Sequence, residues 1–404
     1  MNIFVISQNY YPDNFRINDI TASLVKRGHE VTVLTGLPDY ATSKVPKEYK
    51  KFKKRKETIE GVSVIRVPII ARRSGAVFRS LNYLSFALTA ALYCRFKRLD
   101  FDVIYVYEVS PVTMAYPAAV LKKKTKKKLF LYCLDLWPES VKVFGIKEQS
   151  IAYGMIHHLS KKLYQKCDRI AVTSKPFMDY LHQQNQIPGN KMVYLPQEAD
   201  EAYLTMDLKP LDNKIVDFVF MGNIGKAQDV ECIINAAEKI REVPGFKIHL
   251  IGDGSNYEAC QKLVKDKSLD PIIQFYGRQP VEKMTAFYKL ADACLLTLKC
   301  ENYVGMTMPG KLQGYMAAGK PVIAAINGAA KEVIEAADCG LVTEAGNAEG
   351  LAVLLKAFIE NPDRYVQCGE KGRHYFKAHF TMKTHLDQLE KELEQLITDE
   401  VEHV

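Results

Sequence analysis

Short apolar runs alternate with helix-length segments along most of the chain, and this alternation constrains the fold more than any other feature. The chain opens with an apolar run at residues 2–7, a helical pattern at 16–27 that ends at Gly28, and a second apolar run at 30–35. This order is typical of a strand, a helix and a second strand. Further β-branched or aromatic runs follow at residues 101–107, 128–132 and 169–173. Such alternation predicts a mostly parallel sheet covered by helices.

The second half of the chain repeats the pattern more clearly. Strand-like runs occur at residues 217–221, 247–251, 272–276, 293–298, 321–325 and 340–342, with helical segments between them. Residues 196–211 contain acids and prolines without a strong period, and this composition predicts a linker. A chain of 404 residues is long enough for two or three domains, each with its own apolar core.

We therefore predict an α/β protein with two doubly wound, Rossmann-like domains that face each other across a cleft. The expected boundaries are residues 1–200, residues 201–383, and a charged amphipathic helix at 384–404 that packs back toward the first domain. In such sheets, ligands bind at the carboxyl ends of the strands, where turns and helix N-termini present free N–H groups. Two facing domains suggest two substrates.

Positive charge is concentrated in the first half of the chain. Residues 1–200 contain 32 Lys and Arg against 17 Asp and Glu, whereas the remainder contains 23 against 30. The main basic clusters are Lys50–Lys56, Arg72 with Arg73, and Lys122–Lys128. Between the last two lies an uncharged, mostly apolar run at residues 80–94. As a helix this run would be about 22 Å long, shorter than the roughly 30 Å hydrocarbon core of a bilayer.

Two interpretations of residues 80–94 remain open, a core helix of the first domain and a helix that lies in a membrane interface. The basic clusters favour the second, because cations beside an apolar helix bind anionic headgroups. We therefore expect a protein held peripherally on the inner face of the cell membrane. Nine cysteines without a CxxC spacing and a first segment without a basic leader agree with a cytoplasmic location. Nucleic acid is not an expected partner, because the sequence contains no recognition module.

Two segments of the second half have the features of an anion site. Met308–Lys311 precede a helical pattern, where proline at the first helical position would leave amides uncapped and Lys311 adds a positive charge. The loop Gly222–Lys226 follows a strand and opens another helix. A diphosphate would be stabilised there by the helix dipole and by charge-assisted hydrogen bonds. An ordinary capped helix is the alternative for the first segment.

Five segments resemble family 4 of the retaining glycosyltransferases, which have the two-domain GT-B fold. They are residues 11–19 (YPDNFRIND), 26–35 (KRGHEVTVLT), 135–140 (DLWPES), 220–228 (FMGNIGKAQ) and 309–324 (PGKLQGYMAAGKPVIA). The first three segments resemble the bacterial branch that includes fucosaminyltransferase-like enzymes of surface-polysaccharide assembly. The similarity extends over nearly the whole chain.

The resemblance implies that the second domain binds a nucleotide-sugar, expected to be a UDP-sugar, and transfers its glycosyl group with retained anomeric configuration. No metal and no further cofactor are expected. Lys226 and Lys311 would contact the diphosphate. The resemblance also implies donor contacts in three loops. The residues are Gly222, Asn223 and Gly225 in the first donor loop, Gly277 and Arg278 in the turn that reads the base, and Glu301, Gly305, Met306 and Thr307 in the loop near the sugar.

The sequence departs from the family pattern at the ribose site and in the first domain. Gly314 occupies the place of the ribose-binding glutamate, and Gln313 beside it is our substitute. Asp135 and Glu139 are candidates for orienting the acceptor or the sugar, with a helix cap or an ion pair as the alternative for each. Retaining transfer in this fold does not need an enzyme nucleophile, because an oxygen of the leaving phosphate can take the acceptor proton.

The resulting hypothesis is a glycosyltransferase that elongates a polyprenyl-diphosphate-linked saccharide with an N-acetylated or deoxy amino sugar. Two alternatives remain open. Nucleotide-sugar 2-epimerases share the architecture, but they need no lipid acceptor and should turn over a UDP-sugar alone. A non-catalytic polyanion-binding protein would instead show salt-sensitive affinity for nucleic acid and no specific donor binding.

Overall fold

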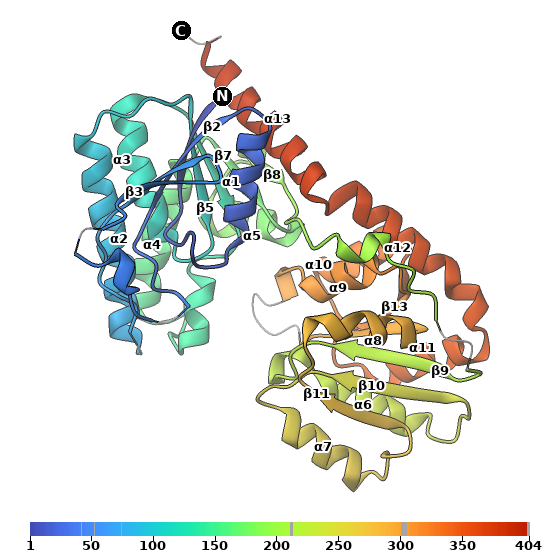
Figure 1. The fold of residues 1–404 in the computed structure, drawn as a ribbon. Coiled ribbons are helices and arrows are strands. Elements are labelled where there is room, and N and C mark those ends of the chain that lie inside the picture. Colours follow the sequence, from blue (N-terminus) through green and yellow to red (C-terminus); the bar gives the residue numbers. More distant parts are fainter. Residues whose placement is uncertain (42, 52, 74, 211–212, 300–304, 402–404) are drawn as a thin grey trace. The chain divides into compact units, whose positions relative to one another are not determined.

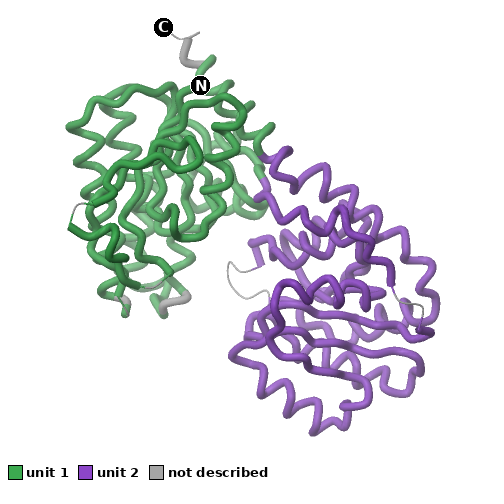
Figure 2. Tube along the Cα trace, in the orientation of Figure 1, with its two compact units in different colours: residues 1–195, 386–404 green, residues 196–385 purple. Residues whose placement is uncertain are grey.

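The computed structural model describes the chain except for residues 42, 52, 74, 211–212, 300–304 and 402–404. The chain divides into two compact units (Figure 2). Unit 1 comprises Met1–Leu195 together with Leu386–Val404, and unit 2 comprises Pro196–His385. Each unit contains a mostly or fully parallel sheet covered by helices (Figure 1). The α/β fold with two doubly wound sheets is therefore confirmed.

Unit 1 has an eight-stranded sheet of order β3-β4-β2-β1-β5-β6-β7-β8. All neighbouring strands are parallel except the antiparallel pair β3 and β4. The strands are β1 (Asn2–Ile6), β2 (Glu30–Thr35), β3 (Lys56–Ile59), β4 (Val62–Arg66), β5 (Val103–Glu108), β6 (Leu129–Cys133), β7 (Arg169–Val172) and β8 (Met192–Tyr194). The helices are α1 (Arg16–Lys26), α2 (Ala76–Phe96), α3 (Ala115–Thr125), α4 (Ile151–Gln165) and α5 (Lys175–Asn185).

Burial explains the elements of unit 1. Every residue of β5 and β6 is buried, as expected for parallel strands with helices on both faces. Helix α1 instead buries one face, through Ile17, Ile20 and Leu24. The β3–β4 hairpin was not predicted, because its edge strand is short and polar. This hairpin turns at Glu60 and Gly61, which both have positive φ.

Unit 2 has a six-stranded, fully parallel sheet of order β11-β10-β9-β12-β13-β14. The strands are β9 (Val216–Met221), β10 (Phe246–Ile251), β11 (Ile273–Gly277), β12 (Ala293–Thr297), β13 (Val322–Ala325) and β14 (Gly340–Thr343). The helices are α6 (Val230–Lys239), α7 (Tyr257–Asp266), α8 (Met284–Leu290), α9 (Gly310–Ala317), α10 (Ala329–Ala337), α11 (Ala348–Glu360) and α12 (Val366–His379). All six predicted strands of this half are present.

The core of unit 2 lies on both faces of its sheet. Phe218 and Phe220 of β9 belong to one apolar cluster, and Val219 and Met221 belong to a second. Alternate residues of a strand point to opposite faces, so β9 supplies both clusters. Because both faces are buried, residues 218–221 of β9 form a continuous apolar run in the sequence.

The last helix, α13 (Met382–Val401), begins in unit 2 and continues in unit 1. Within unit 1, Arg27 pairs with Asp387 and with Glu390, each at 2.7 Å. Gln388 Nε2 donates to the carbonyl oxygen of Tyr194 at 2.7 Å. These contacts join the last helix to elements near the start and the end of the first unit.

Candidate active site

The carboxyl ends of β9, β10 and β11 form one edge of the unit 2 sheet, and backbone hydrogen bonds join the loops that follow them. The Gly222 amide donates to the Ile251 carbonyl, and the Gly252 amide donates to the Gly277 carbonyl, each at 2.9 Å. A Cβ atom on Gly252 would lie 1.7 Å from the Gly222 carbonyl oxygen, so a side chain cannot fit there. The loop predicted to hold the diphosphate is therefore linked through Gly252, in the loop after β10, to the turn predicted to read the base.

Lys311 is the second residue of α9, and its side chain lies across Gly222. A Cβ atom on Gly222 would approach Cε of Lys311 to 2.9 Å, so glycine leaves room for the lysine stem. The Nζ atom lies 3.9 Å from the centroid of the Phe220 ring and has no hydrogen-bond partner among the described residues. The structure thus brings together Lys311 and Gly222, two predicted site residues that are far apart in the sequence.

Burial of the Lys311 ammonium group lowers its pKa from 10.5 to about 7. The contact with Phe220 is a cation–π interaction, which contributes about 2 kcal/mol when desolvated. An uncompensated buried charge costs several kcal/mol, so the ring offsets only part of this cost. Helix α9 follows Pro309, and among the residues that the structure describes no side chain caps its first amides. A phosphate at this position would accept hydrogen bonds from Nζ and from the amides, and its charge would compensate that of Lys311.

The predicted residues of the first donor loop lie in a tight turn between β9 and the 3₁₀ helix Lys226–Gln228. Gln228 Oε1 accepts hydrogen bonds from Asn223 Nδ2 at 3.0 Å and from the Gly225 amide at 3.2 Å. Asn223 and Gly225 therefore shape the loop. Lys226 is exposed. Its contact with the diphosphate stays a prediction.

Two further loops carry the remaining predicted donor residues. Arg278 is exposed directly after Gly277, which ends β11 with a positive φ of 65°. The Gly305 carbonyl oxygen would lie 2.0 Å from a Cβ atom on Gly328, so the loop before α9 packs against the loop after β13. The other predicted residues of this loop are Met306 and Thr307, which are half-buried, and Glu301, which lies outside the described residues.

Gln313 and its neighbour Tyr315 anchor α9 within unit 2. Gln313 is 6% exposed, and its Nε2 donates to the backbone carbonyl of Gln197 at 2.8 Å. The Tyr315 hydroxyl accepts a hydrogen bond from the Met221 amide at 3.0 Å, at the end of β9. One donor of Gln313 therefore holds the segment that enters unit 2. Its role at the ribose stays a prediction.

In unit 1, Asp135 lies just beyond β6 in a largely buried position. Burial raises its pKa to about 6, and the hydrogen bond that the Ser140 hydroxyl donates to it acts in the opposite direction. A carboxyl group with this pKa is mostly ionised at neutral pH and can accept a hydrogen bond from a substrate hydroxyl. The environment of Asp135 is therefore compatible with its predicted role in orienting an acceptor, which stays a prediction.

Glu139 begins the 3₁₀ helix Glu139–Phe144 and binds three donors. Its carboxylate accepts hydrogen bonds from Tyr153 at 2.5 Å and Tyr180 at 2.9 Å, and it pairs with Lys142 at 2.8 Å. Burial acts to raise the pKa of Glu139, but these donors outweigh it and the pKa lies below its ordinary value. The carboxylate thus joins the 3₁₀ helix to α4 and α5.

Sequence reasoning missed Glu108, the last residue of β5. Glu108 is fully buried, and its two carboxyl oxygens lie 3.2 and 3.3 Å from the Tyr164 hydroxyl, which donates to them. Burial, and then the neighbouring Asp135, raises the pKa of Glu108 well above its ordinary value. The sequence feature that could have indicated Glu108 is its position as an acid at the end of an otherwise apolar strand. Gly252 was not predicted either, because its role depends on its close contact with Gly222 from a distant segment.

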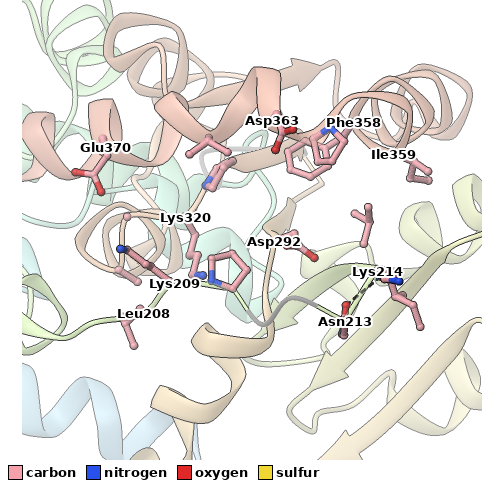
Figure 3. Close-up of a pocket in the computed structure, with 18 of the residues that line it drawn as sticks. Leu208, Lys209, Asn213, Lys214, Asp292, Lys320, Phe358, Ile359, Asp363 and Glu370 are labelled. Carbon is pink, nitrogen blue, oxygen red and sulfur yellow. Dashed lines mark hydrogen bonds between the residues drawn. The ribbon is translucent and has the colours of Figure 1, made fainter.

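A cavity of about 880 Å³ lies at the opposite, amino edge of the unit 2 sheet (Figure 3). Within its lining, Lys320 Nζ donates to the carbonyl of Ala291 at 2.7 Å, and the Asp292 carboxylate accepts from the Asp217 amide at 2.7 Å. Burial lowers the pKa of Lys320 to about 8. None of the predicted donor residues that the structure describes lines this cavity. Because ligands of open α/β sheets bind at the carboxyl ends of strands, we assign the candidate active site to the edge that carries Lys311.

Two protein-family models match the chain. The model described as "Glycosyl transferase 4-like domain" matches residues 14–197, and the model described as "Glycosyl transferases group 1" matches residues 208–375. The second match contains Gly222 and Lys311, and the first contains Asp135 and Glu139. The two models together leave only residues 1–13, 198–207 and 376–404 unmatched.

Named proteins with similar sequences agree with these matches. WcaI of Escherichia coli K12, named for colanic acid biosynthesis as a glycosyl transferase, is 22% identical over 340 residues, which cover 79% of this chain and 82% of that protein. N-acetyl-alpha-D-glucosaminyl L-malate synthase of Bacillus anthracis is 22% identical over 382 residues, covering 92% of this chain and 91% of that enzyme.

A solved structure shows the same fold over nearly the whole chain. The crystal structure of Anabaena Alr3699/HepE in complex with UDP superposes with a TM-score of 0.71 at 14% identity, covering 98% of this chain and 100% of that one. The two parallel-sheet units of this chain and its likeness to solved glycosyltransferase structures agree with the GT-B architecture. The chain therefore belongs to the family 4 glycosyltransferases of the GT-B fold.

Proposed function

We propose that the protein is a retaining, metal-independent glycosyltransferase that uses a UDP-sugar carrying an N-acetylated or deoxy amino sugar. Its acceptor is a saccharide linked to polyprenyl diphosphate, at the inner face of the cell membrane. The proposed donor rests on one observation. The buried Lys311 ammonium group lies at the start of α9 against Gly222, and it has no hydrogen-bond partner among the described residues. A diphosphate is a ligand whose charge and oxygens match these groups.

The chemistry follows from the charge that develops on the donor. When the bond between the anomeric carbon and the diphosphate breaks, negative charge grows on the leaving phosphate and positive charge grows on the sugar. Lys311 and the first amides of α9 stabilise the leaving group because they are in place before the reaction begins. An oxygen of the leaving phosphate takes the proton of the acceptor hydroxyl, so the acceptor attacks from the face that the phosphate leaves. The anomeric configuration is thereby retained.

In this proposal the two acids of unit 1 have different roles. Asp135, with a pKa of about 6, accepts a hydrogen bond from the acceptor and orients it. Glu139 acts as a positioning residue, because its carboxylate already binds Tyr153, Tyr180 and Lys142. The 3₁₀ helix that Glu139 begins follows directly from the segment that carries Asp135.

The names of similar proteins support the choice of substrates. HepE was crystallised with UDP, and the Bacillus anthracis relative is named for an N-acetylated amino sugar. The Escherichia coli relative is named for colanic acid biosynthesis. We extend these substrate classes to this chain because the candidate site contains the positive charge that a nucleoside diphosphate requires.

Calorimetry with UDP, UMP and GDP tests the donor. We expect UDP to bind most tightly, and UMP to bind more weakly because it lacks the second phosphate. Lys311→Met should weaken UDP binding, whereas Lys262→Met, at an exposed lysine of α7, should not. Unchanged UDP affinity in Lys311→Met would contradict the diphosphate site. Equal affinities for GDP and UDP would contradict the choice of base.

Product analysis separates the proposed transferase from the two alternatives. A panel of UDP-sugars is incubated with the protein, with and without lipid-linked saccharides extracted from membranes. We expect a new glycolipid and free UDP only when both substrates are present. A new UDP-sugar formed from the donor alone would identify a 2-epimerase. Salt-sensitive binding of nucleic acid without donor binding would identify the polyanion-binding alternative.

A further inference from the structure

Helix α2 presents apolar side chains to solvent along its whole length. Residues spaced by three or four form a stripe along one side of the helix, with exposed fractions between 39% and 72%: Val77, Leu81, Leu84, Leu88, Leu92 and Phe96. On the opposite side, Phe86, Ala90 and Cys94 are fully buried in unit 1. Because a surface helix normally keeps polar residues outward, this second apolar side needs a partner.

A second exposed apolar row lies on α4. Ile151, Met155 and Leu159 follow one another at intervals of four residues, and Ile151 is 86% exposed. Helix α3 contacts both α2 and α4, so the three helices form one layer over the unit 1 sheet (Figure 1). We name these two rows of exposed apolar side chains the α2–α4 surface.

The charge of this helical layer has a single sign. Helices α2, α3 and α4 contain no Asp or Glu, and they contain seven basic residues: Arg79, Arg95, Lys122, Lys123, Lys124, Lys161 and Lys162. By contrast, α13 contains acids, and two of them, Asp387 and Glu390, pair with Arg27. The helices that carry the α2–α4 surface therefore contribute only positive side chains, although Lys122 pairs with Asp168 at 2.7 Å and Lys124 donates to backbone carbonyls at the end of α2.

Cations also flank both ends of α2. Before its first turn lies a cavity of about 640 Å³, whose charged lining residues in the described part of the chain are Lys44, Lys50 and Arg73. The Arg73 guanidinium lies 5.2 Å from the centroid of the Phe78 ring, which joins this basic cavity to the helix. Beyond its last turn, Lys97 and Arg98 continue the positive charge.

We propose that the α2–α4 surface lies in the interface of an anionic phospholipid bilayer, with its apolar side chains at the boundary of headgroups and acyl chains and its cations at the lipid phosphates. An apolar helix face bordered by cations is the pattern that binds such an interface. The helix lies on the bilayer and does not cross it, because its other side packs in unit 1. No helix in the described part of the chain is long and apolar enough to span a membrane.

A second copy of the chain fits this surface less well. In a symmetric dimer, the same patch from each subunit would meet, and basic residues would face basic residues. A bilayer that contains anionic lipid instead supplies both the apolar interior and the opposite charge. The inference deepens the proposed function and rests on it, because a polyprenyl-linked acceptor is presented in a bilayer.

Sedimentation with vesicles tests the proposal without any sugar donor. The variant Leu84→Ser/Leu88→Ser removes two exposed leucines of α2, and Val353→Ser/Val366→Ser removes two valines of unit 2 that are 64% and 62% exposed. With vesicles of phosphatidylcholine and phosphatidylglycerol, we expect the leucine variant to bind at least tenfold more weakly and the valine variant to bind like the native protein. Vesicles of phosphatidylcholine alone should bind much less native protein.

The same variants keep this proposal separate from the donor site. All three proteins should bind UDP equally, since the substitutions lie outside the donor loops. Equal vesicle binding by the leucine variant and the native protein would overturn the membrane surface, even if UDP binding is as expected. If the native protein binds vesicles but does not bind UDP, the proposed donor is overturned and the membrane surface is not.

Depth-dependent quenching gives a second readout. The native chain has one tryptophan, Trp137, which is 8% exposed. Leu88→Trp should be quenched by brominated acyl chains in anionic vesicles, whereas Val353→Trp should not. Equal quenching of the two variants would contradict the proposed orientation. Sedimentation velocity measures whether the native protein is a dimer. If the native dimer dissociates in the leucine variant while vesicle binding is unchanged, the surface binds a second copy of the chain and the proposal is overturned.

Discussion

Raising the pH above neutrality should weaken UDP binding, because the group that receives the diphosphate loses its charge. Burial holds the pKa of Lys311 at about 7 in the free protein. A bound diphosphate favours the charged form and raises this pKa. About half of the free protein then carries a charged Lys311 at pH 7, and about 3% does so at pH 8.5. The dissociation constant of UDP should therefore rise about 15-fold between these two pH values.

The stability of the unliganded protein should change in the opposite direction. Because the pKa of Lys311 is lower in the folded state, the unfolded chain binds more protons between about pH 7 and 10.5, and the free energy of unfolding rises with pH across this window. The full difference corresponds to at most about 5 kcal/mol. Lys311→Met removes the buried charge and keeps an apolar stem, so it should stabilise the free protein by about 1–4 kcal/mol. The variant should melt at a higher temperature and bind UDP more weakly.

Calorimetry at pH 7 and 8.5, in two buffers with different ionisation enthalpies, measures both the affinity and the protons taken up. We expect uptake of about half a proton per UDP at pH 7 and nearly one at pH 8.5 in the native protein and in Lys262→Met. Lys311→Met should show neither the uptake nor the pH dependence. A dissociation constant that is independent of pH in the native protein would refute the reasoning, as would a pH dependence retained by Lys311→Met.

Three further substitutions test other parts of the account. Gly252→Ala should weaken UDP binding at least tenfold in calorimetry, because its Cβ would lie 1.7 Å from the Gly222 carbonyl oxygen; native affinity would contradict the packing of the two loops. Asp135→Asn should lower the transfer rate about 100-fold at unchanged UDP affinity, and native activity should rise as pH increases through about 6; equal rates would remove Asp135 from the acceptor site. Glu139→Gln should lower thermal stability, by about 1–3 kcal/mol, with a smaller effect on the rate than Asp135→Asn, and a native melting temperature would contradict its positioning role.

The strands of both sheets were largely predictable, because parallel strands buried on both faces appear as continuous apolar runs. For the run at residues 80–94, the sequence did not predict which side chains are buried and which are exposed. A core helix and an interfacial helix were considered as alternatives, yet α2 buries Phe86 and exposes Leu88, so one helix has both an inner and an outer apolar side. Local composition could not separate these two sides, because the packing of α2 on unit 1 decides them.

The predicted site depended on contacts between distant segments. The lysine in the segment Met308–Lys311 could be identified as a candidate, but its contacts with Gly222 and Phe220 arise only when α9 packs beside the end of β9. In the basic run Lys122–Lys128, by contrast, a lysine that was predicted to contact a membrane packs within unit 1. Lys124 donates to the carbonyl oxygens of Cys94 and Lys97, at 3.1 and 2.6 Å, and so caps the end of α2. Part of a cluster that indicated membrane contact therefore has a structural role.

A crystal structure of the protein with bound UDP tests the central claim most directly. The diphosphate should lie at the start of α9, within hydrogen-bond distance of Lys311 Nζ and beside Gly222. UDP bound in the cavity at the amino edge of the unit 2 sheet, with Lys311 still without an anionic partner, would contradict it.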